Sequence, residues 1–221
     1  MENKAVSSTI RICAVLVVIQ VVRILFSQTL LKYVEKTAFA IDIVTMVTMI
    51  ILTIIIFIAA RKLDIPLSFF PDMKTRTQKV LYVSATAVVL ILAVSMPVFT
   101  QDYSPGTILP ILYSVIITPV FEEIIFRGYV WNALRASGKS EIRTYLISTI
   151  LFAVWHFGYS DVIWLKSTLP GSVIDSNLLF IMLMKVGVGL FFGVVVGFVR
   201  FKTKNTYAAI LMHGVMNIFG R

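Results

Sequence analysis

The sequence predicts an all-α fold, a polytopic transmembrane bundle with about seven transmembrane helices. Of the 221 residues, 58% are apolar and only 14% are charged, and the mean hydropathy is +0.92. Soluble domains carry far more charge than this. No polar linker, repeat or low-complexity stretch divides the chain, so we expect one integral membrane domain over residues 1–221.

Seven apolar stretches are predicted to cross or enter the bilayer. A crossing helix needs roughly 20 apolar residues. The last stretch has only about 14, so we expect it to insert deeply without emerging far on the other side. In chain order the stretches are 10–31, 39–60, 80–100, 107–136, 143–157, 178–199 and 206–219.

The connections have distinct compositions. Residues 61–79 carry five bases together with Asp64, Asp72 and two prolines, which predicts an irregular cytoplasmic loop. The short stretch 101–106 has no lysine or arginine and is expected to face outward. Pro97 is predicted to break the third helix near its end. Residues 158–177 are semi-polar and predict an outer loop that lies partly in the membrane interface.

Basic residues are divided unequally between the two sides of this topology. The formal charge of +9 could suggest nucleic acid, but the bases cluster in short loops, where they normally set orientation. We therefore expect no nucleic-acid partner, a cytoplasmic N-terminus and a place in a cell membrane, a bacterial plasma membrane being favoured. One side holds Lys4, Arg11, Arg61, Lys62, Lys74, Arg76, Lys79, Arg135, Lys139, Arg143, Arg200, Lys202 and Lys204, and the other holds Lys32, Lys36, Lys166 and Arg221.

Three isolated charges within the spans have ordinary explanations. Arg23 and Lys185 are predicted to reach the interface with their long side chains, and Asp42 is expected to lie in the interface or near the helix N-terminus. The glycines of the sixth span are more informative. Three of them recur every four residues and predict close packing against another helix: Gly189, Gly193 and Gly197.

Two adjacent carboxylates interrupt the fourth apolar stretch. A bilayer imposes roughly 2.5–3.5 kcal/mol on each such residue at mid-depth, so their presence needs a reason. Glu123 and Arg127 stand at i, i+4 and can form an ion pair. Neighbouring helical residues point about 100° apart. Glu122 is therefore predicted to face something other than Arg127.

Polar groups on two further helices reach the same depth. The two histidines of the chain, His156 and His213, both lie in apolar stretches, where an ionisable side chain is a functional candidate by default. Glu122, His156 and Asn217 each lie thirteen residues from a base at the predicted cytoplasmic end of their helices, a rise of about 20 Å. His213 and Asn217 share one helical face at i, i+4. We expect these groups to form one site.

The chemistry that suits this set is the addition of water to a carbonyl. A carboxylate removed from water accepts a proton more readily than an exposed one, which suits Glu122 as a general base assisted by His156. His213 and Asn217 can donate two hydrogen bonds to a tetrahedral oxyanion. Glu123 and Arg127 would then stabilise the helix and set the local electrostatic field.

A zinc site is the competing chemistry, because two histidines and a glutamate could hold a catalytic metal. The His-Glu-x-x-His pattern is absent, and zinc would need ligands from three separate helices. No cofactor is expected, and zinc stays the less favoured possibility. A serine nucleophile is disfavoured further, because no serine stands near either histidine in an exposed-elbow pattern.

These residues resemble the three motifs of the CAAX-protease and bacteriocin-processing intramembrane proteases, often called the CPBP or Abi family. The resemblance covers residues 107–219, which it identifies as a CAAX protease-like catalytic core. Order and spacing agree for Glu-Glu-x-x-x-Arg, Phe-x-x-x-His and His-x-x-x-Asn, found here at Glu122, Glu123 and Arg127, at Phe152 and His156, and at His213 and Asn217.

The resemblance implies an intramembrane endopeptidase in which Glu122 and His156 activate water while His213 and Asn217 form the oxyanion site. Its expected partners are the lipid bilayer and a membrane-associated peptide or protein substrate. Members that trim prenylated proteins carry a further helix after the last motif, whereas this chain runs four residues past Asn217. The likeness is therefore to bacterial members associated with peptide processing and bacteriocin immunity. The alternative is a non-catalytic immunity or peptide-binding membrane protein.

Overall fold

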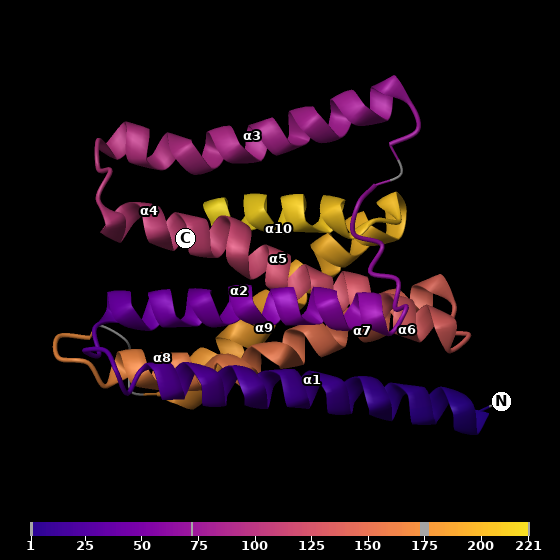
Figure 1. The fold of residues 1–221 in the computed structure, drawn as a ribbon, viewed down its shortest axis with the longest axis horizontal. Coiled ribbons are helices and arrows are strands. Elements are labelled where there is room, and N and C mark those ends of the chain that lie inside the picture. The colour runs from indigo at the N-terminus through magenta and orange to yellow at the C-terminus, as the bar shows by residue number, and fades with distance from the viewer. Residues whose placement is uncertain (1, 72, 173–176, 221) are drawn as a thin grey trace.

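A computed structural model describes residues 2–71, 73–172 and 177–220, and within these residues all regular secondary structure is helical, with no strand (Figure 1). The long helices run side by side, with α3 along one edge of the bundle and α1 along the opposite edge. The all-α prediction is confirmed. The α-helices are α1 (Glu2–Leu30), α2 (Ala38–Lys62), α3 (Arg76–Thr100), α4 (Pro105–Leu112), α5 (Thr118–Glu123), α6 (Trp131–Ala136), α7 (Glu141–Trp155), α8 (Ser160–Ser167), α9 (Leu178–Thr203) and α10 (Thr206–Phe219).

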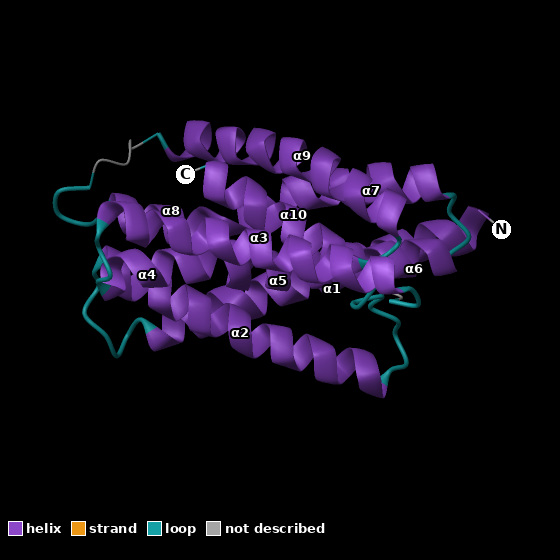
Figure 2. Cartoon of the chain, turned by 90° about the horizontal axis from the view of Figure 1, so that it is seen from above, coloured by secondary structure: helices purple, strands orange, loops and turns teal. Residues whose placement is uncertain are grey.

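Six helical segments within the described residues are long and apolar enough to cross a membrane, and the shorter α10 is the seventh apolar helix. The prediction of about seven helices is confirmed, and the chain is a multi-pass integral membrane protein. The loops gather at the two ends of the bundle (Figure 2). We call them the 31–37 end, where α1 leads into α2, and the 63–75 end, where α2 leads into α3.

Side-chain caps fix where several helices begin. Thr37 accepts a hydrogen bond from the backbone N–H of Ala40 at the start of α2. Thr75 and Gln78 form a capping box at the start of α3. Ser140 and Asn205 cap α7 and α10 in the same manner. Such caps satisfy N–H groups that have no partner within the helix, so they define the ends of the spans.

The 63–75 loop is irregular, as predicted, and it folds back onto the bundle; Asp72 lies outside the described residues. The backbone N–H of Thr206 donates to the Ser68 carbonyl at 2.8 Å. The Asn132 side chain donates to the Pro66 carbonyl at 2.5 Å. The loop therefore joins the starts of α10 and α6 to α2.

The fourth span is one continuous helical segment with two π-helical stretches, η1 (Tyr113–Ile117) and η2 (Ile124–Val130), which the sequence reading treated as ordinary α-helix. Pro119 lies just after η1 and has no N–H to donate, so the regular ladder is interrupted there. Stretches of π-helix often coincide with functional sites. Here the two flank α5, which carries Glu122 and Glu123.

Two predicted helix ends are wrong. The helix after residue 143 was expected to end at 157, but it continues through the 3₁₀ turn η3 (His156–Tyr159) and α8. Buried contacts of Tyr159 and Asp161 hold this segment in the bundle, and composition alone did not reveal them. Residues 173–176 of the predicted outer loop lie outside the described residues. Helix α3 also runs through Pro97 to Thr100, because one lost hydrogen bond near a helix end is tolerated.

The explanation given for Arg23 is also wrong, and Asp42, close to the start of α2 as predicted, has a partner that the sequence did not reveal. Arg23 is fully buried, and its guanidinium pairs with Asp161 at 2.7 Å and donates to the Gly158 carbonyl. Asp42 accepts a hydrogen bond from the Lys166 ammonium at 2.6 Å. Both partners lie in the segment that was predicted to be a loop. Neither charge therefore needs the interface to be satisfied.

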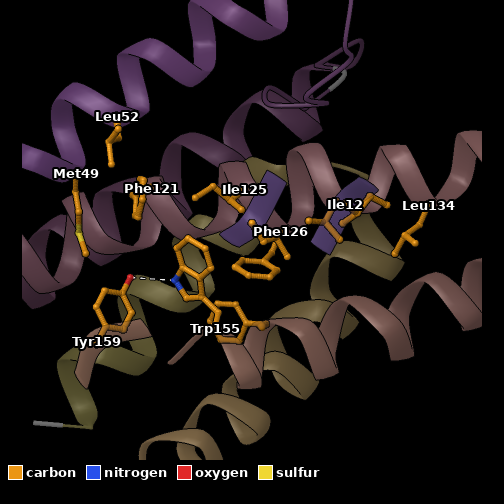
Figure 3. Close-up of a cluster of buried hydrophobic side chains, with 12 residues drawn as sticks. Ile12, Met49, Leu52, Phe121, Ile125, Phe126, Leu134, Trp155 and Tyr159 are labelled. Atoms are coloured by element: carbon orange, nitrogen blue, oxygen red, sulfur yellow. Dashed lines mark hydrogen bonds between the residues drawn. The ribbon is translucent and has the colours of Figure 1, made fainter. Parts of the chain in front are cut away.

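The interior packs around aromatic rings contributed by α5, η2 and α7. The Phe126 ring meets the Trp155 ring edge to face at a centroid distance of 5.5 Å (Figure 3). It meets the Phe152 ring in the same manner at 5.2 Å. The glycine face of α9 packs against α7, as predicted: a Cβ on Gly197 would lie 2.9 Å from the Tyr145 ring. A Cβ on Gly193 would lie 3.2 Å from Thr149. These contacts bring α9 close to the helix that carries His156.

Candidate active site

Four of the six predicted site residues line one cavity of about 560 Å³ inside the bundle. They are Glu122, His156, His213 and Asn217, which come from three different helical elements, α5, η3 and α10. Glu123 and Arg127 lie directly behind them and are completely buried. The structure therefore brings the predicted groups together, while their chemical roles stay predictions.

Glu123 and Arg127 form the ion pair that their spacing predicted. Arg127 Nε lies 3.2 Å from Glu123 Oε2, and Nη1 donates to Oε1 at 3.3 Å. The other end of the guanidinium donates to the Gly193 carbonyl at 3.2 Å, and its centre lies 4.4 Å from the centroid of the Phe152 ring. Close approach of α9 at Gly193 thus supplies part of the environment that this buried cation needs.

His213 lies between the two carboxylates. Its Nδ1 is 2.7 Å from Glu123 Oε1, and its Nε2 is 3.9 Å from Glu122 Oε2. A carboxylate can only accept in this contact, so Nδ1 carries a proton and donates to Glu123. The remaining nitrogen, Nε2, is the one directed toward Glu122 and the cavity.

Glu122 has a partner that the sequence analysis missed. The Tyr159 hydroxyl donates to Glu122 Oε1 at 2.5 Å, and it accepts a hydrogen bond from Trp155 Nε1 at 3.1 Å (Figure 3). The guanidinium of Arg23 lies 5.0 Å from the Tyr159 ring centroid. Tyr159 follows His156 by three residues, a spacing that shares a helical face. This spacing could have identified Tyr159 from the sequence, but residues 158–177 were predicted to be a loop, where helical spacing does not apply.

The orientation of His156 is fixed from two sides. Its Nδ1 lies 2.9 Å from the Phe152 carbonyl, one turn earlier, so Nδ1 is the protonated nitrogen and Nε2 is free to accept. A Cβ on Gly189 would lie only 2.6 Å from Nδ1, so the ring packs directly on the backbone of α9. Only glycine permits this approach of α9 to the imidazole.

Asn217 satisfies a carbonyl that the π-helical stretch leaves open. In η1 the N–H of Thr118 bonds to the Tyr113 carbonyl, and the next residue, Pro119, has no N–H. The Ser114 carbonyl therefore lacks a helical partner, and the Asn217 side chain donates to it at 2.6 Å. This bond uses one of the two hydrogens on Asn217 Nδ2 and holds the amide at the cavity wall.

A metal centre does not emerge from these donors. Within residues 2–71, 73–172 and 177–220, no three His, Cys, Asp or Glu side chains converge in a way that could hold a metal ion. Glu123 instead pairs with His213 and with Arg127. Metal independence stays a prediction.

The fold and site define a class: multi-pass membrane proteins that enclose ionisable groups in a cavity within the helical bundle. The model of a protein family described as type II CAAX prenyl endopeptidase, Rce1-like, matches residues 104–219. The chain belongs to this family, which confirms the resemblance drawn from the three motifs. All six candidate residues fall within the match, and α1, α2 and α3 fall outside it. Comparisons with curated proteins and with solved structures found no match.

Proposed function

We propose that this chain is an intramembrane endopeptidase that hydrolyses a peptide bond of a membrane-associated peptide or protein. Membership of the Rce1-like family supports protease activity in general. The observation that carries the more specific proposal is the convergence of Glu122, His156, His213 and Asn217 on one cavity within the membrane-spanning bundle.

Glu122 is the general base. Its carboxylate is 1% exposed and lines the cavity, and one oxygen is oriented by the Tyr159 hydroxyl. The other oxygen takes a proton from the attacking water, while His156 Nε2 accepts a hydrogen bond from the same water molecule. The water oxygen then forms a bond to the carbonyl carbon of the substrate.

His213 and Asn217 stabilise the tetrahedral oxyanion. Asn217 offers the second hydrogen of Nδ2, because the first is bonded to the Ser114 carbonyl. His213 donates from Nε2 in its doubly protonated form, with Nδ1 held by Glu123. Donors fixed in advance stabilise developing charge without reorganisation, and loss of one typically costs about 10²–10³ in rate.

Glu122 completes the cycle by returning the proton to the amide nitrogen. The carbon–nitrogen bond then breaks, which releases an amine and a carboxylic acid and restores the Glu122 carboxylate. Glu123 and Arg127 act through His213 and the local field, without contacting the substrate. No metal or organic cofactor takes part. We place the protein in a bacterial plasma membrane with its N-terminus in the cytoplasm.

The proposal is tested with purified protein in liposomes and a mixture of apolar peptides, with new peptide ends identified by mass spectrometry. The wild-type protein should cleave a subset of the peptides. Asn217→Ala should lower the rate about 10²–10³-fold. The control Gln28→Ala removes an amide from α1, away from the cavity, and should leave the rate unchanged. Full activity of Asn217→Ala would contradict the oxyanion assignment.

The same assay separates the alternatives. Treatment with 1,10-phenanthroline should not lower the rate, whereas a loss that added zinc restores would assign the site to a metalloprotease. A non-catalytic immunity protein would cleave none of the peptides and would keep its biological activity in Asn217→Ala.

A further inference from the structure

The cavity has a second polar region, toward the 31–37 end of the bundle. Asp42, Lys166 and Lys185 line it there, together with apolar side chains such as Ile181 and Met184. Lys166 and Asp42 pair at 2.6 Å and satisfy one another. The Lys185 ammonium makes no hydrogen bond or ion pair with any residue in the described part of the chain. Lys185 therefore presents an unpaired cation to a largely apolar cavity.

Helix α9 connects Lys185 to the candidate active site. Gly189 lies one turn further along α9 and touches His156. Phe192, seven residues beyond Lys185, lines the same cavity, and its ring centroid lies 5.4 Å from that of His213. Four residues of α-helix rise about 6 Å, so Lys185 lies roughly that far from the level of His156.

A cation within apolar walls is costly unless an anion pairs with it, and its attraction to an anion is stronger there than in water. Two acids line the cavity: Asp42 pairs with Lys166, and Glu122 attracts Lys185 but is hydrogen-bonded to the Tyr159 hydroxyl. Neither carboxylate contacts the Lys185 ammonium, so a direct anionic partner is left for a ligand in the cavity to supply. In a cavity that admits a peptide, the commonest such group is a carboxylate.

We propose that Lys185 is a carboxylate-binding subsite that selects peptides with an anionic group on the 31–37 side of the scissile bond. This inference rests on the proposed function, because it takes the ligand to be a peptide. An extended peptide advances about 3.3 Å per residue, so the carboxylate lies roughly two to four residues from the bond. It is either an Asp or Glu side chain or the free C-terminus.

Binding is measured by fluorescence anisotropy on Glu122→Gln protein in nanodiscs, so that no cleavage interferes. Four fluorescein-labelled apolar decapeptides serve as probes, in two pairs. The peptides of the first pair differ only at the C-terminus, which is a free carboxylate or an amide. The peptides of the second pair are both amidated and differ at the third residue from the end, which is Glu or Gln. Peptides with a carboxylate should bind about tenfold or more tightly than their neutral counterparts in at least one pair. The pair that shows the difference identifies the source of the carboxylate.

Lys185→Met should abolish that preference and Lys185→Arg should keep it. Lys202→Met removes an exposed lysine from the other end of α9 and should change nothing. An undiminished preference in Lys185→Met, or no preference in either pair, would overturn the subsite. A third outcome would also overturn the subsite: all four peptides bind equally well, and phosphatidylglycerol is retained by the wild-type lysine but not by Lys185→Met. That result would assign Lys185 to lipid binding.

A parallel cleavage assay on otherwise wild-type protein keeps the two proposals apart. A carboxylate preference without any cleavage would support the subsite and contradict the enzyme. Cleavage without a carboxylate preference would contradict the subsite alone.

Discussion

Two buried arginines in this membrane protein are satisfied in different ways. Arg127 pairs with Glu123 four residues earlier in the same helical segment, at 3.2 Å. Arg23, on α1, pairs at 2.7 Å with Asp161 on α8, far away in the sequence. Both guanidinium groups are completely buried, so each needs an acid. The sequence reveals the first pair through its spacing, whereas the second depends on how distant helices pack.

The two pairs also support different halves of the candidate active site. The pair of Arg127 holds Glu123, which in turn binds His213. The pair of Arg23 holds the η3–α8 segment, which presents Tyr159 to Glu122. One pair lies inside the family match and the other joins α1 to it. The comparison therefore predicts which substitutions damage folding and which damage chemistry.

The largest effect on folding is expected for Arg127→Ala. Removing the guanidinium leaves the Glu123 carboxylate buried with only His213 beside it, and breaking a fully buried pair costs roughly 3–5 kcal/mol. SDS titration of the purified protein should show a large loss in the free energy of unfolding. Arg143→Ala, an exposed arginine on α7, is the control and should be neutral. Equal stability of the two variants would contradict a structural role for the pair.

Arg23→Ala should cost less, about 1–3 kcal/mol, because the Asp161 side chain is 12% exposed and is not left wholly buried. The same variant should also lower peptide cleavage, since the segment that carries Tyr159 loses its anchor to α1. Unfolding and cleavage are measured on one preparation. A stability loss as large as that of Arg127→Ala would show that the two pairs do not differ as proposed.

The smallest structural effect is expected for Tyr159→Phe, which removes only the hydrogen bond to Glu122 and the acceptor for Trp155. As a positioning residue, Tyr159 should affect kcat by roughly tenfold and leave KM unchanged. Tyr33→Phe, at an exposed position near the 31–37 end, is the matched control. A change in KM alone would assign Tyr159 to substrate binding.

Local patterns account for what the sequence predicted of the fold. Apolar runs gave the seven helices, and the four-residue glycine repeat gave the packing of α9 on α7. The π-helical stretches and the continuation through α8 were missed. Each depends on contacts between distant residues, such as Asn217 with the Ser114 carbonyl and Arg23 with Asp161. Hydropathy and spacing contain no information about such partners.

The candidate site follows the same division. Its six residues stand in short motifs of fixed spacing, so all of them could be named from the sequence, and the structure brings them together. Tyr159 and Lys185 reach the same cavity but belong to none of these motifs. Lys185 was predicted to reach the interface, and its place on the cavity wall emerges only from the packing of α9.

The central claim is that two adjacent carboxylates have different tasks, Glu122 in chemistry and Glu123 in structure. The most direct measurement compares the cleavage rate and the unfolding free energy of Glu122→Gln and Glu123→Gln in one liposome assay. Glu122→Gln should lose roughly 10²–10⁴ in rate, as expected for a general base, with stability unchanged. Glu123→Gln should lose stability because Arg127 is left without its acid. Full activity of Glu122→Gln, or equal destabilisation of both variants, would contradict the claim.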